Sequence, residues 1–275
     1  MIPDIASGHV ALKYGFKGIN YAVVSACASS SHCIGDAFRN IKHGYSDLII
    51  TGGAEATITP MAIAGFSNMK ALTKNPDPNT ASKPFDKNRD GFVISEGAGI
   101  LILEELEHAK NRNAKIYAEI KGFGATADAY HITTPHPEAE GAIKSMQYAI
   151  EEARLDINDI DYINAHGTST QYNDLTETKA IKSIFKDSSK NIFISSTKSM
   201  IGHSLGASGA LEAINTILTI NNSLITPTIN YTTPDPECDL NYVPNSSINQ
   251  NIDNALSNSF GFGGHNATLA IGKYH

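Results

Sequence analysis

The sequence predicts an α/β protein whose strands are mostly parallel. Short apolar segments alternate along the chain with amphipathic segments, which is the order typical of βαβ units. The same order of elements occurs twice, once before and once after a polar connector at residues 108–114. With 275 residues, 41% of them hydrophobic, the chain can form one large core or two packed halves. We therefore expect two halves of similar organisation, residues 1–111 and residues 112–275.

The first half begins with residues 5–18, which are typical of a helix that ends in a glycine-rich turn. Because a domain rarely opens in a helix without a capping segment, we expect this half to lack an N-terminal portion. A strand is predicted over residues 19–26, and the next helix ends near Gly44. Its apolar positions are Ile34, Ala37, Phe38 and Ile41. Two further strands, residues 47–55 and 98–105, flank a long irregular loop at residues 66–91.

The second half repeats this alternation. Strands are predicted over residues 116–124, 160–167 and 191–199, with helices over residues 138–154 and 174–185 between them. Asp174 is in a position to cap the second of these helices. The apolar positions that mark the first helix and a later, long apolar helix are Ile143, Met146, Ile150 and Ala153, and then Leu211, Ile214, Ile217 and Leu218. Residues 255–272 are predicted to close the fold as a hairpin around a glycine loop.

Composition excludes several classes of function. The formal net charge of −7 is opposite to that of a nucleic-acid-binding protein. No apolar run approaches the ~20 residues that span a membrane, and residues 1–10 lack the pattern of a secretory signal. The three cysteines are too few and uneven in number for a disulfide framework, which favours a reducing compartment such as the cytoplasm.

Cys27 lies where the strand predicted over residues 19–26 meets a helix. Two interpretations are open. A free cysteine is most often a small buried hydrophobic residue. At a helix N-terminus, however, backbone N–H groups and the helix dipole favour a reactive thiolate.

Two other segments carry candidate residues. His166 follows a buried strand in the segment Asn164–Thr170, and Lys198 and His203 lie in a Gly/Ser-rich turn before a helix. Side chains beyond the carboxyl ends of parallel strands converge on one crevice, so a cysteine nucleophile with two histidine partners is expected there. Each residue taken alone also fits a structural role, because most histidines satisfy local hydrogen bonds. A zinc site at Cys27, His32 and Cys33 is disfavoured because its spacing matches no usual zinc pattern.

Four segments together resemble the β-ketoacyl-acyl carrier protein synthases, which are condensing enzymes with the thiolase fold. The segments are ACASSSHCIG (residues 26–35), AHGTST (165–170), STKSMIGHSLGASGALE (196–212) and NSFGFGGHN (258–266). The presence of two histidines is similar to the pattern of the elongating synthases. Residues 85–99 and 198–212 are most similar to synthase II. The resemblance implies two similar βαβαβ halves in α-β-α-β-α layers, with the first half incomplete at its N-terminus. The expected activity is fatty acid elongation by decarboxylative Claisen condensation of malonyl-acyl carrier protein.

The resemblance also implies roles for individual residues. Cys27 would be the nucleophile, His166 and His203 would stabilise the enolate, and Lys198 with Glu177 would orient them. The backbone N–H groups of Cys27 and Phe262 would form the oxyanion hole, with Phe262 as the gate of the acyl pocket. Thr168 and Thr170 would bind the pantetheine arm. Glu212 would belong to a structural network near a monovalent cation, with Asn164, Ser257 and Asn258 as the other candidates; no other metal is required.

The implied partner is the acyl carrier protein, in its acyl and malonyl forms, and no cofactor is expected because phosphopantetheine arrives on the carrier. Since carrier protein and chain are both acidic, docking requires a local basic patch. Lys70 occupies the place where the resembling enzymes use a basic residue, and Lys74, Lys87 and Arg89 lie nearby. A homodimer is also implied, whereas nucleic acid and membrane are not expected as partners.

Two other functions are compatible with parts of the sequence. A non-catalytic partner subunit or an inactive fragment would fit the missing N-terminal portion, although a partner of the chain-length-factor type would lack Cys27. A Cys–His hydrolase would also use a cysteine and a histidine, but a histidine pair with a lysine fits condensation better.

Overall fold

A mixed five-stranded sheet forms the centre of the molecule. The computed structural model describes residues 2–275. The strand order is β3-β9-β8-β4-β5, and β4 is parallel to both of its neighbours while the β3–β9 and β9–β8 pairs are antiparallel. The strands are β3 (Glu119–Ala127), β4 (Tyr162–Asn164), β5 (Phe193–Ser195), β8 (Asn254–Gly261) and β9 (His265–Gly272). The parallel strands expected of this half are thus confined to β5, β4 and β8.

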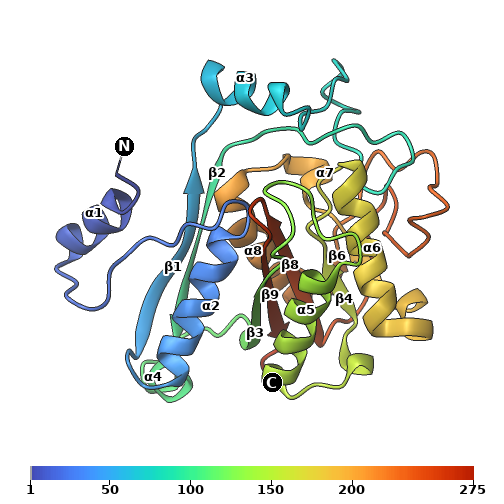
Figure 1. The fold of residues 1–275 in the computed structure, drawn as a ribbon. Helices are drawn as coiled ribbons and strands as arrows, with labels where there is room; N and C mark the ends of the chain where they lie inside the picture. Colours follow the sequence, from blue (N-terminus) through green and yellow to red (C-terminus); the bar gives the residue numbers. More distant parts are fainter. Residues whose placement is uncertain (1) are drawn as a thin grey trace.

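Helices cover both faces of this sheet (Figure 1). Helices α5 (Glu140–Ala153) and α6 (Gln171–Phe185) pack on one face, and α2 (Ser29–Lys42) and α8 (Ser208–Asn222) on the other. Alternate residues along a strand serve the two cores: Leu256 packs toward α5 and α6, and its neighbour Ala255 packs toward α8. The sheet is therefore buried on both faces, as its apolar sequences predict.

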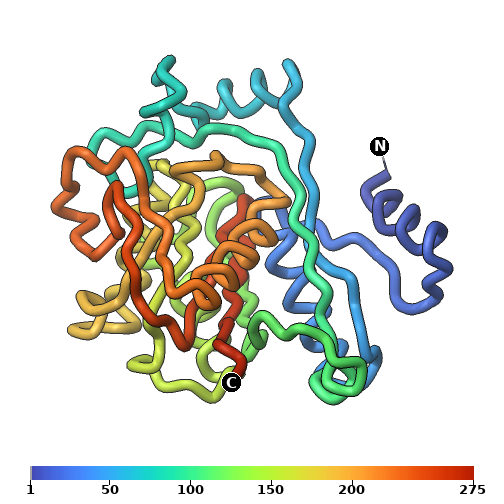
Figure 2. The backbone as a smooth tube through the Cα atoms, turned by 180° about the vertical axis from the view of Figure 1, so that it is seen from behind, coloured from blue at the N-terminus to red at the C-terminus, as the bar shows by residue number. Residues whose placement is uncertain are grey.

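A second, two-stranded sheet lies on the far side of α2 and α8. Strands β1 (Leu48–Glu55) and β2 (Gly97–Glu104) pair antiparallel over their whole length and pack against these two helices. From α5 and α6 outward the layers are thus helix, sheet, helix and sheet (Figure 2). Four of the five expected layers are formed, and no helix among residues 2–275 covers the outer face of β1 and β2.

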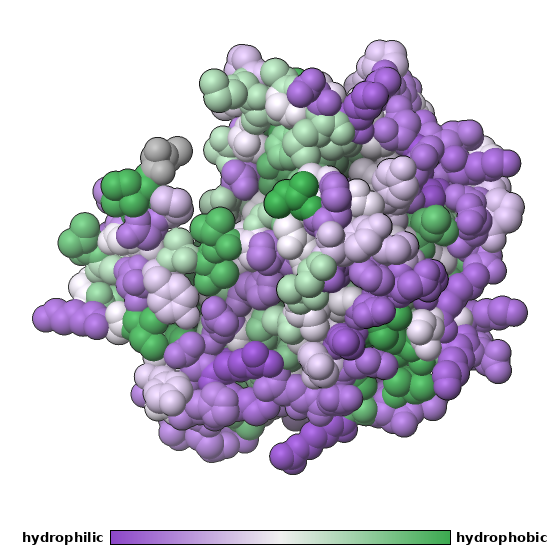
Figure 3. Space-filling view, in the orientation of Figure 1, coloured by the Kyte–Doolittle hydropathy of each residue, from purple (hydrophilic) through white to green (hydrophobic). Residues whose placement is uncertain are grey.

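The segment before α2 stands apart from the core. Helix α1 (Ile5–Tyr14) buries no residue and ends, as expected, at a glycine, Gly15, with φ +69°. The strand predicted over residues 19–26 is wrong, because these residues have no partner strand among the described residues and form only an isolated bridge at Ser25. Hydrophobic side chains of α1 and the segment after it are exposed, among them Leu12 at 82% and Val24 at 74% (Figure 3).

The remaining elements are short connectors. Helix α3 (Pro60–Asn68) enters the predicted loop by three residues, and residues 69–91 are irregular apart from isolated bridges. The others are α4 (Leu106–Asn111), α7 (Lys198–Ile201), the 3₁₀ turns η1 (Ile157–Asp159), η2 (Lys186–Lys190) and η3 (Leu205–Ala207), and the pair β6 (Leu224–Ile225) and β7 (Ile248–Asn249). No helix in residues 2–275 is long and apolar enough to cross a membrane.

Two details of the predicted helices differ. Helix α6 begins at Gln171, three residues before the predicted start, so Asp174 is not its cap. Helix α8 has the expected position, but its most deeply buried face carries small and polar residues such as Ala213 and Glu212, while Leu218 is 48% exposed. This face is polar because it packs against the site described next.

Candidate active site

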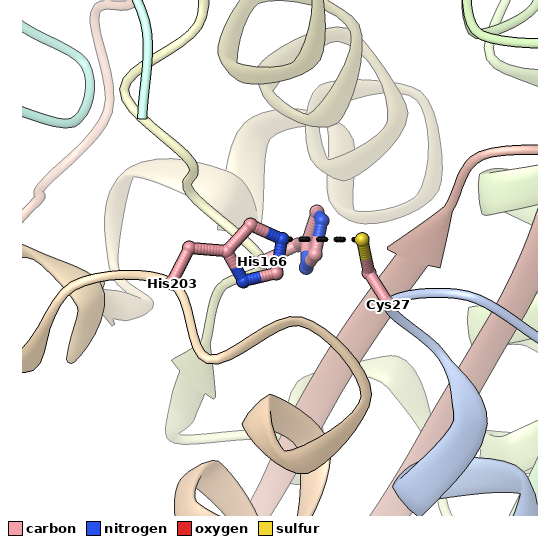
Figure 4. A group of neighbouring side chains, drawn as sticks. All are labelled: Cys27, His166 and His203. Atoms are coloured by element: carbon pink, nitrogen blue, oxygen red, sulfur yellow. Dashed lines mark hydrogen bonds between the residues drawn. The ribbon is translucent and has the colours of Figure 1, made fainter. Parts of the chain in front are cut away.

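Three side chains from distant parts of the chain meet in one buried place. Cys27 precedes α2, His166 follows β4, and His203 follows α7 (Figure 4). The Sγ atom of Cys27 lies 3.2 Å from Nε2 of His203, and the two imidazole rings are 5.4 Å apart between centroids. All three residues are buried, with exposures of 7%, 2% and 2% for Cys27, His166 and His203. The structure therefore brings together the nucleophile and the two histidines predicted from sequence.

Cys27 lies just before α2, where two backbone donors act on its thiol. The N–H groups of Phe262 and of Cys27 itself both lower the pKa of this thiol. These are the two N–H groups that the family resemblance predicts for an oxyanion hole. The approach depends on Gly261, since a Cβ atom there would meet the Ser25 carbonyl oxygen at 2.7 Å and the Cys27 nitrogen at 3.1 Å. Sequence reasoning identified the glycine loop as a turn but missed this requirement.

Burial works against a charged sulfur at Cys27. It raises the pKa of the thiol to about 11, although Lys198 and the N–H group of Phe262 act in the opposite direction. The stabilisation of a thiolate expected from the helix N-terminus is thus opposed by the desolvation of the sulfur. A base is needed when the sulfur attacks, and Nε2 of His203 is within reach.

Lys198 fixes the tautomer of His166. Its ammonium group lies 3.3 Å from Nδ1 of His166 and donates to the His166 carbonyl oxygen at 2.7 Å. An ammonium group can only donate, so Nδ1 accepts and the ring proton is on Nε2. Burial, Lys198 and His203 together lower the pKa of His166 well below 6.5, so the ring is neutral. His166 is therefore a fixed N–H donor.

His203 is neutral but has a less restricted tautomer. Burial and Lys198 lower its pKa well below 6.5. Its Nδ1 atom lies 2.8 Å from the hydroxyl of Ser208, which can either donate or accept. Nε2 can thus carry a proton or take one from Cys27. Ser208 was not identified from the sequence, where its hydroxyl had no distinguishing pattern in a Ser-rich turn.

Two buried carboxylates support the histidines. Glu212 forms an ion pair with Lys198, and burial raises the pKa of Glu212 to about 7. Glu177 accepts hydrogen bonds from the backbone N–H groups of His166 at 2.9 Å and Gly167 at 2.8 Å, and burial raises its pKa to about 6. Glu177 thus orients the His166 backbone, while Lys198 orients the ring.

Three buried oxygens on β4, β8 and α8 have no hydrogen-bond partner among residues 2–275. They are Oε2 of Glu212, Oδ1 of Asn164 and Oγ of Ser257. Asn164 and Ser257 face each other across the β4–β8 pair, and Asn164 also contacts the Glu212 carbonyl oxygen. Unsatisfied oxygens of this type fit a monovalent cation. Asn258 differs, because its amide already contacts Glu177 and Thr268.

The predicted binding residues range from the buried Thr168 to the exposed Lys70. The hydroxyls of Thr168 and Thr170 are 2.9 Å apart on the loop after His166. Phe262 is half-buried, and Lys70 is exposed at the end of α3 with Lys74 further along the loop. The prediction that Arg89 belongs to the basic patch is wrong: Arg89 is 4% exposed, since its guanidinium group is held by Asp235 and by the buried Asp174.

A zinc site at residues 27–33 is not formed. His32 bonds Ser25 through Nδ1, and Cys33 accepts from Thr51, so neither contacts Cys27. The donor atoms of Cys27, His166 and His203 lie within 4.8 Å of one another, which is close enough to share a metal ion. The ammonium group of Lys198 beside His166 opposes a divalent cation there.

Comparison with known proteins agrees with this geometry. Residues 1–109 match the family described as Beta-ketoacyl synthase, N-terminal domain, and residues 117–232 match Beta-ketoacyl synthase, C-terminal domain. Proteins named 3-oxoacyl-[acyl-carrier-protein] synthase 2 from Staphylococcus aureus (strain COL) and Synechocystis sp. (strain ATCC 27184 / PCC 6803 / Kazusa) are each 54% identical over 100% of this chain. The chain spans 66% of the length of each. Another Staphylococcus aureus protein of that name is 55% identical over 98% of the chain and 67% of its own length.

Solved structures show the same fold. A Beta-ketoacyl synthase from Burkholderia phymatum STM815 superposes with a TM-score of 0.95 at 42% identity, over 100% of this chain and 66% of that one. A ketosynthase solved in complex with its type II PKS acyl-carrier protein gives 0.96 at 39% identity, over 98% and 66%. The thiolase-like fold is therefore confirmed, and the chain belongs to the beta-ketoacyl synthase family.

Proposed function

We propose that this chain carries the site of fatty acid elongation by decarboxylative Claisen condensation. In this reaction malonyl-acyl carrier protein condenses with an acyl group on Cys27 and gives 3-ketoacyl-acyl carrier protein. The observation that carries the proposal is the contact of the Cys27 sulfur with Nε2 of His203, beside a second neutral histidine and a buried lysine. The names of the Staphylococcus aureus and Synechocystis relatives support the same reaction.

In the first half-reaction the acyl group moves to Cys27. The sulfur attacks the thioester carbon while the thiol proton passes to Nε2 of His203. The N–H groups of Cys27 and Phe262 stabilise the oxyanion of the tetrahedral intermediate. When this intermediate collapses, the pantetheine sulfur leaves and takes the proton from His203. Ser208 allows this exchange because it bonds Nδ1 in either tautomer.

In the second half-reaction the malonyl thioester loses CO₂. Negative charge develops on the thioester oxygen, where the Nε2–H group of His166 is available as a donor. His203 donates as well once its ring proton has moved from Nδ1 to Nε2, because the Ser208 hydroxyl can then donate to Nδ1. Both rings are neutral, so each can donate without carrying charge into a buried site. The carbanion then attacks the acyl carbon on Cys27, and the Cys27 thiolate leaves and takes up a proton from solvent.

Supporting groups keep this arrangement in place. Lys198 holds the His166 tautomer, Glu177 holds the His166 backbone, and Glu212 balances the charge of Lys198. A monovalent cation would be held by Asn164, Glu212 and Ser257, and it would supply positive charge behind the Lys198–Glu212 pair. It is a structural group in this proposal and takes part in no step.

The substrates are delivered by an acidic acyl carrier protein. Lys70 is exposed and available to bind it, and Thr168 and Thr170 are placed to bond the pantetheine arm near His166. No cofactor of the chain's own is needed, because the arm arrives on the carrier. One structural relative was solved as a ketosynthase in complex with its carrier protein, which supports this partner.

We also propose a homodimer in the cytoplasm. The exposed apolar residues of α1 and of residues 16–24 support a further protein contact, since patches of this kind mark interaction sites. Sedimentation analysis of the purified chain checks the assembly, and a concentration-independent monomer would contradict it.

Mass spectrometry of the protein after incubation with acyl-acyl carrier protein tests the proposed function. The expected result is one acyl group, mapped to the peptide of Cys27 and absent from Cys27→Ala. Cys33 and Cys238 serve as internal controls, because neither faces the two backbone donors of the site. Acylation of Cys33 or Cys238 would overturn the assignment, and no acylation at all would favour a non-catalytic partner subunit or an inactive fragment.

A further inference from the structure

Residues 82–95 form a strap that runs from the irregular loop to β2 across the loops of both histidines. At its C-terminal end the strap holds His203. The His203 N–H group donates to the Val93 carbonyl oxygen at 2.7 Å, and the Ser95 N–H group donates to the His203 carbonyl oxygen at 3.0 Å. The ring of Phe92 packs edge-on against the His203 imidazole, with centroids 5.1 Å apart. His203 is thus held by a segment from the first half of the chain.

Residues 83–91 of the strap hold the loop after His166. The Ser169 carbonyl oxygen accepts from the Gly91 N–H group at 2.9 Å, and the Ser169 hydroxyl accepts from the Lys83 N–H group at 3.1 Å. Ser169 has φ +66°, in the left-handed region that non-glycine residues rarely adopt. A backbone of this kind persists only when its surroundings hold it. The loop therefore depends on the strap for its shape.

Arg89 is the central side chain of this contact. Its Nε donates to the Thr170 carbonyl oxygen at 3.2 Å, and Nη2 donates to the Gln171 carbonyl oxygen at 3.3 Å. Nη1 donates to Asp235 at 2.6 Å and to the Asp86 carbonyl oxygen at 2.9 Å. The guanidinium group thus joins three segments of the chain while it remains buried.

Asp174 completes the connection. One carboxylate oxygen lies 3.7 Å from Nε of Arg89 and accepts from the Phe85 N–H group at 2.8 Å. The other accepts from the Thr168 N–H group at 3.0 Å. The backbone of Thr168 is therefore held through Asp174 and that of Thr170 directly by Arg89.

We propose that Arg89 is a positioning residue, which keeps the Thr168 and Thr170 hydroxyls aligned with His166 for the pantetheine arm of a substrate. The inference rests on the proposed function and adds a residue that touches neither substrate nor reacting atoms. It follows from geometry, since lysine in place of arginine keeps the charge but cannot reach two loop carbonyls and Asp235 at once. If the loop moves by about 1 Å, the rate of the reaction at the site can fall by up to about 100-fold.

The test is Arg89→Lys in the full chain, assayed with malonyl-pantetheine so that carrier docking plays no part. We expect KM to rise about 10-fold or more, with a smaller fall in kcat for CO₂ release. The assay is run well below the melting temperature of the variant. A lower melting temperature with unchanged KM would overturn the proposal, because it would mean that Arg89 only stabilises the fold.

Two further variants make the result decisive. Lys83→Gln is the matched control, because Lys83 contacts Ser169 only through its backbone, and its KM should equal that of the parent. Asp235→Asn weakens the hold on Arg89 with little change of shape and should raise KM less than Arg89→Lys. If Arg89→Lys does not fold, an unchanged KM in Asp235→Asn overturns the proposal. If the parent protein itself releases no CO₂ from malonyl-pantetheine, the result contradicts the proposed function instead.

Discussion

Two antiparallel strand pairs of equal length behave differently in this molecule. Strands β1 and β2 have eight residues each, as do β8 and β9. In the β8–β9 pair Leu256 and Leu269 are fully buried, whereas in β2 Ile100 is 58% exposed and Ile102 is 61% exposed. Helices cover both faces of the β8–β9 pair but only one face of the β1–β2 pair. A strand with an apolar sequence is thus predicted to be buried on both faces, but its own sequence does not show which other segments pack against those faces.

The candidate site belongs to the covered pair. Gly261 ends β8 beside Cys27, and β4, which leads to His166, pairs with β8. Helix α2, which begins just after Cys27, and helix α8 together form the layer shared by both pairs. The comparison therefore indicates that the stability of the fold and the chemistry of the site both depend on β8 and β9. The exposed face of β2 contributes little to either.

The largest expected effect is on stability. Leu269→Ala removes a fully buried side chain and should lower the free energy of unfolding by about 2–5 kcal/mol. Ile102→Ala removes a mostly exposed side chain and should cost less than about 1 kcal/mol. Urea denaturation at constant m-value measures both. Equal losses would contradict the comparison and show that the outer face of β2 is covered in solution.

A glycine exchange in each pair tests the chemistry. Gly261→Ala should slow acylation of Cys27 by about 10²–10³-fold, because its Cβ atom displaces the backbone donors of the oxyanion hole. Gly97→Ala on β2 is the control, since its Cβ atom meets only the flexible Leu211 side chain, at 3.1 Å. Rapid-quench acylation with an acyl-pantetheine gives both rates. If Cys27 of Gly261→Ala is acylated at the rate of the parent protein, the N–H groups near Gly261 do not form an oxyanion hole.

A smaller effect is expected at the exposed docking surface. Lys70→Glu should raise KM for malonyl-acyl carrier protein by roughly 2- to 10-fold, and added salt should reduce the difference. KM for malonyl-pantetheine should stay the same, because Lys70 lies at the surface and not among the buried groups. An equal rise in KM with both substrates would mean that Lys70 acts in the reaction itself and not in carrier binding.

The smallest expected effect is that of pH on CO₂ release. The pKa values of His166 and His203 are lowered by burial, so both rings stay neutral as pH falls through the usual range for histidine. In Cys27→Ala neither ring should titrate between about pH 6 and pH 8, so any change in rate there follows the buried carboxyl groups of Glu177 and Glu212, whose pKa values are raised to about 6 and about 7. Imidazole NMR signals of His166 or His203 that titrate with a midpoint near 6.5 would mean that these rings are solvated like exposed histidines.

Much of this could be predicted from the sequence. Helical spacing located α2 and α5, and the glycine loop located the β8–β9 hairpin, because these are local patterns. Cys27, His166 and His203 were found because each lies in a recognisable segment at the end of an element.

What failed depended on long-range contacts. The strand expected over residues 19–26 has the right composition but no partner strand in the described residues. Arg89 looked like a surface cation, because nothing local shows that Asp235, 146 residues away, pairs with it. The raised pKa of the Cys27 thiol also follows from burial, which the helix start alone does not reveal.

The most direct test of the account follows CO₂ release from malonyl-acyl carrier protein in Cys27→Ala and His203→Ala. The account predicts that Cys27→Ala still decarboxylates but cannot condense, while His203→Ala loses about 10²–10³-fold in decarboxylation although its cysteine is intact. Parent-rate CO₂ release by His203→Ala together with an inactive Cys27→Ala would reverse the roles of the two residues and contradict a condensing site.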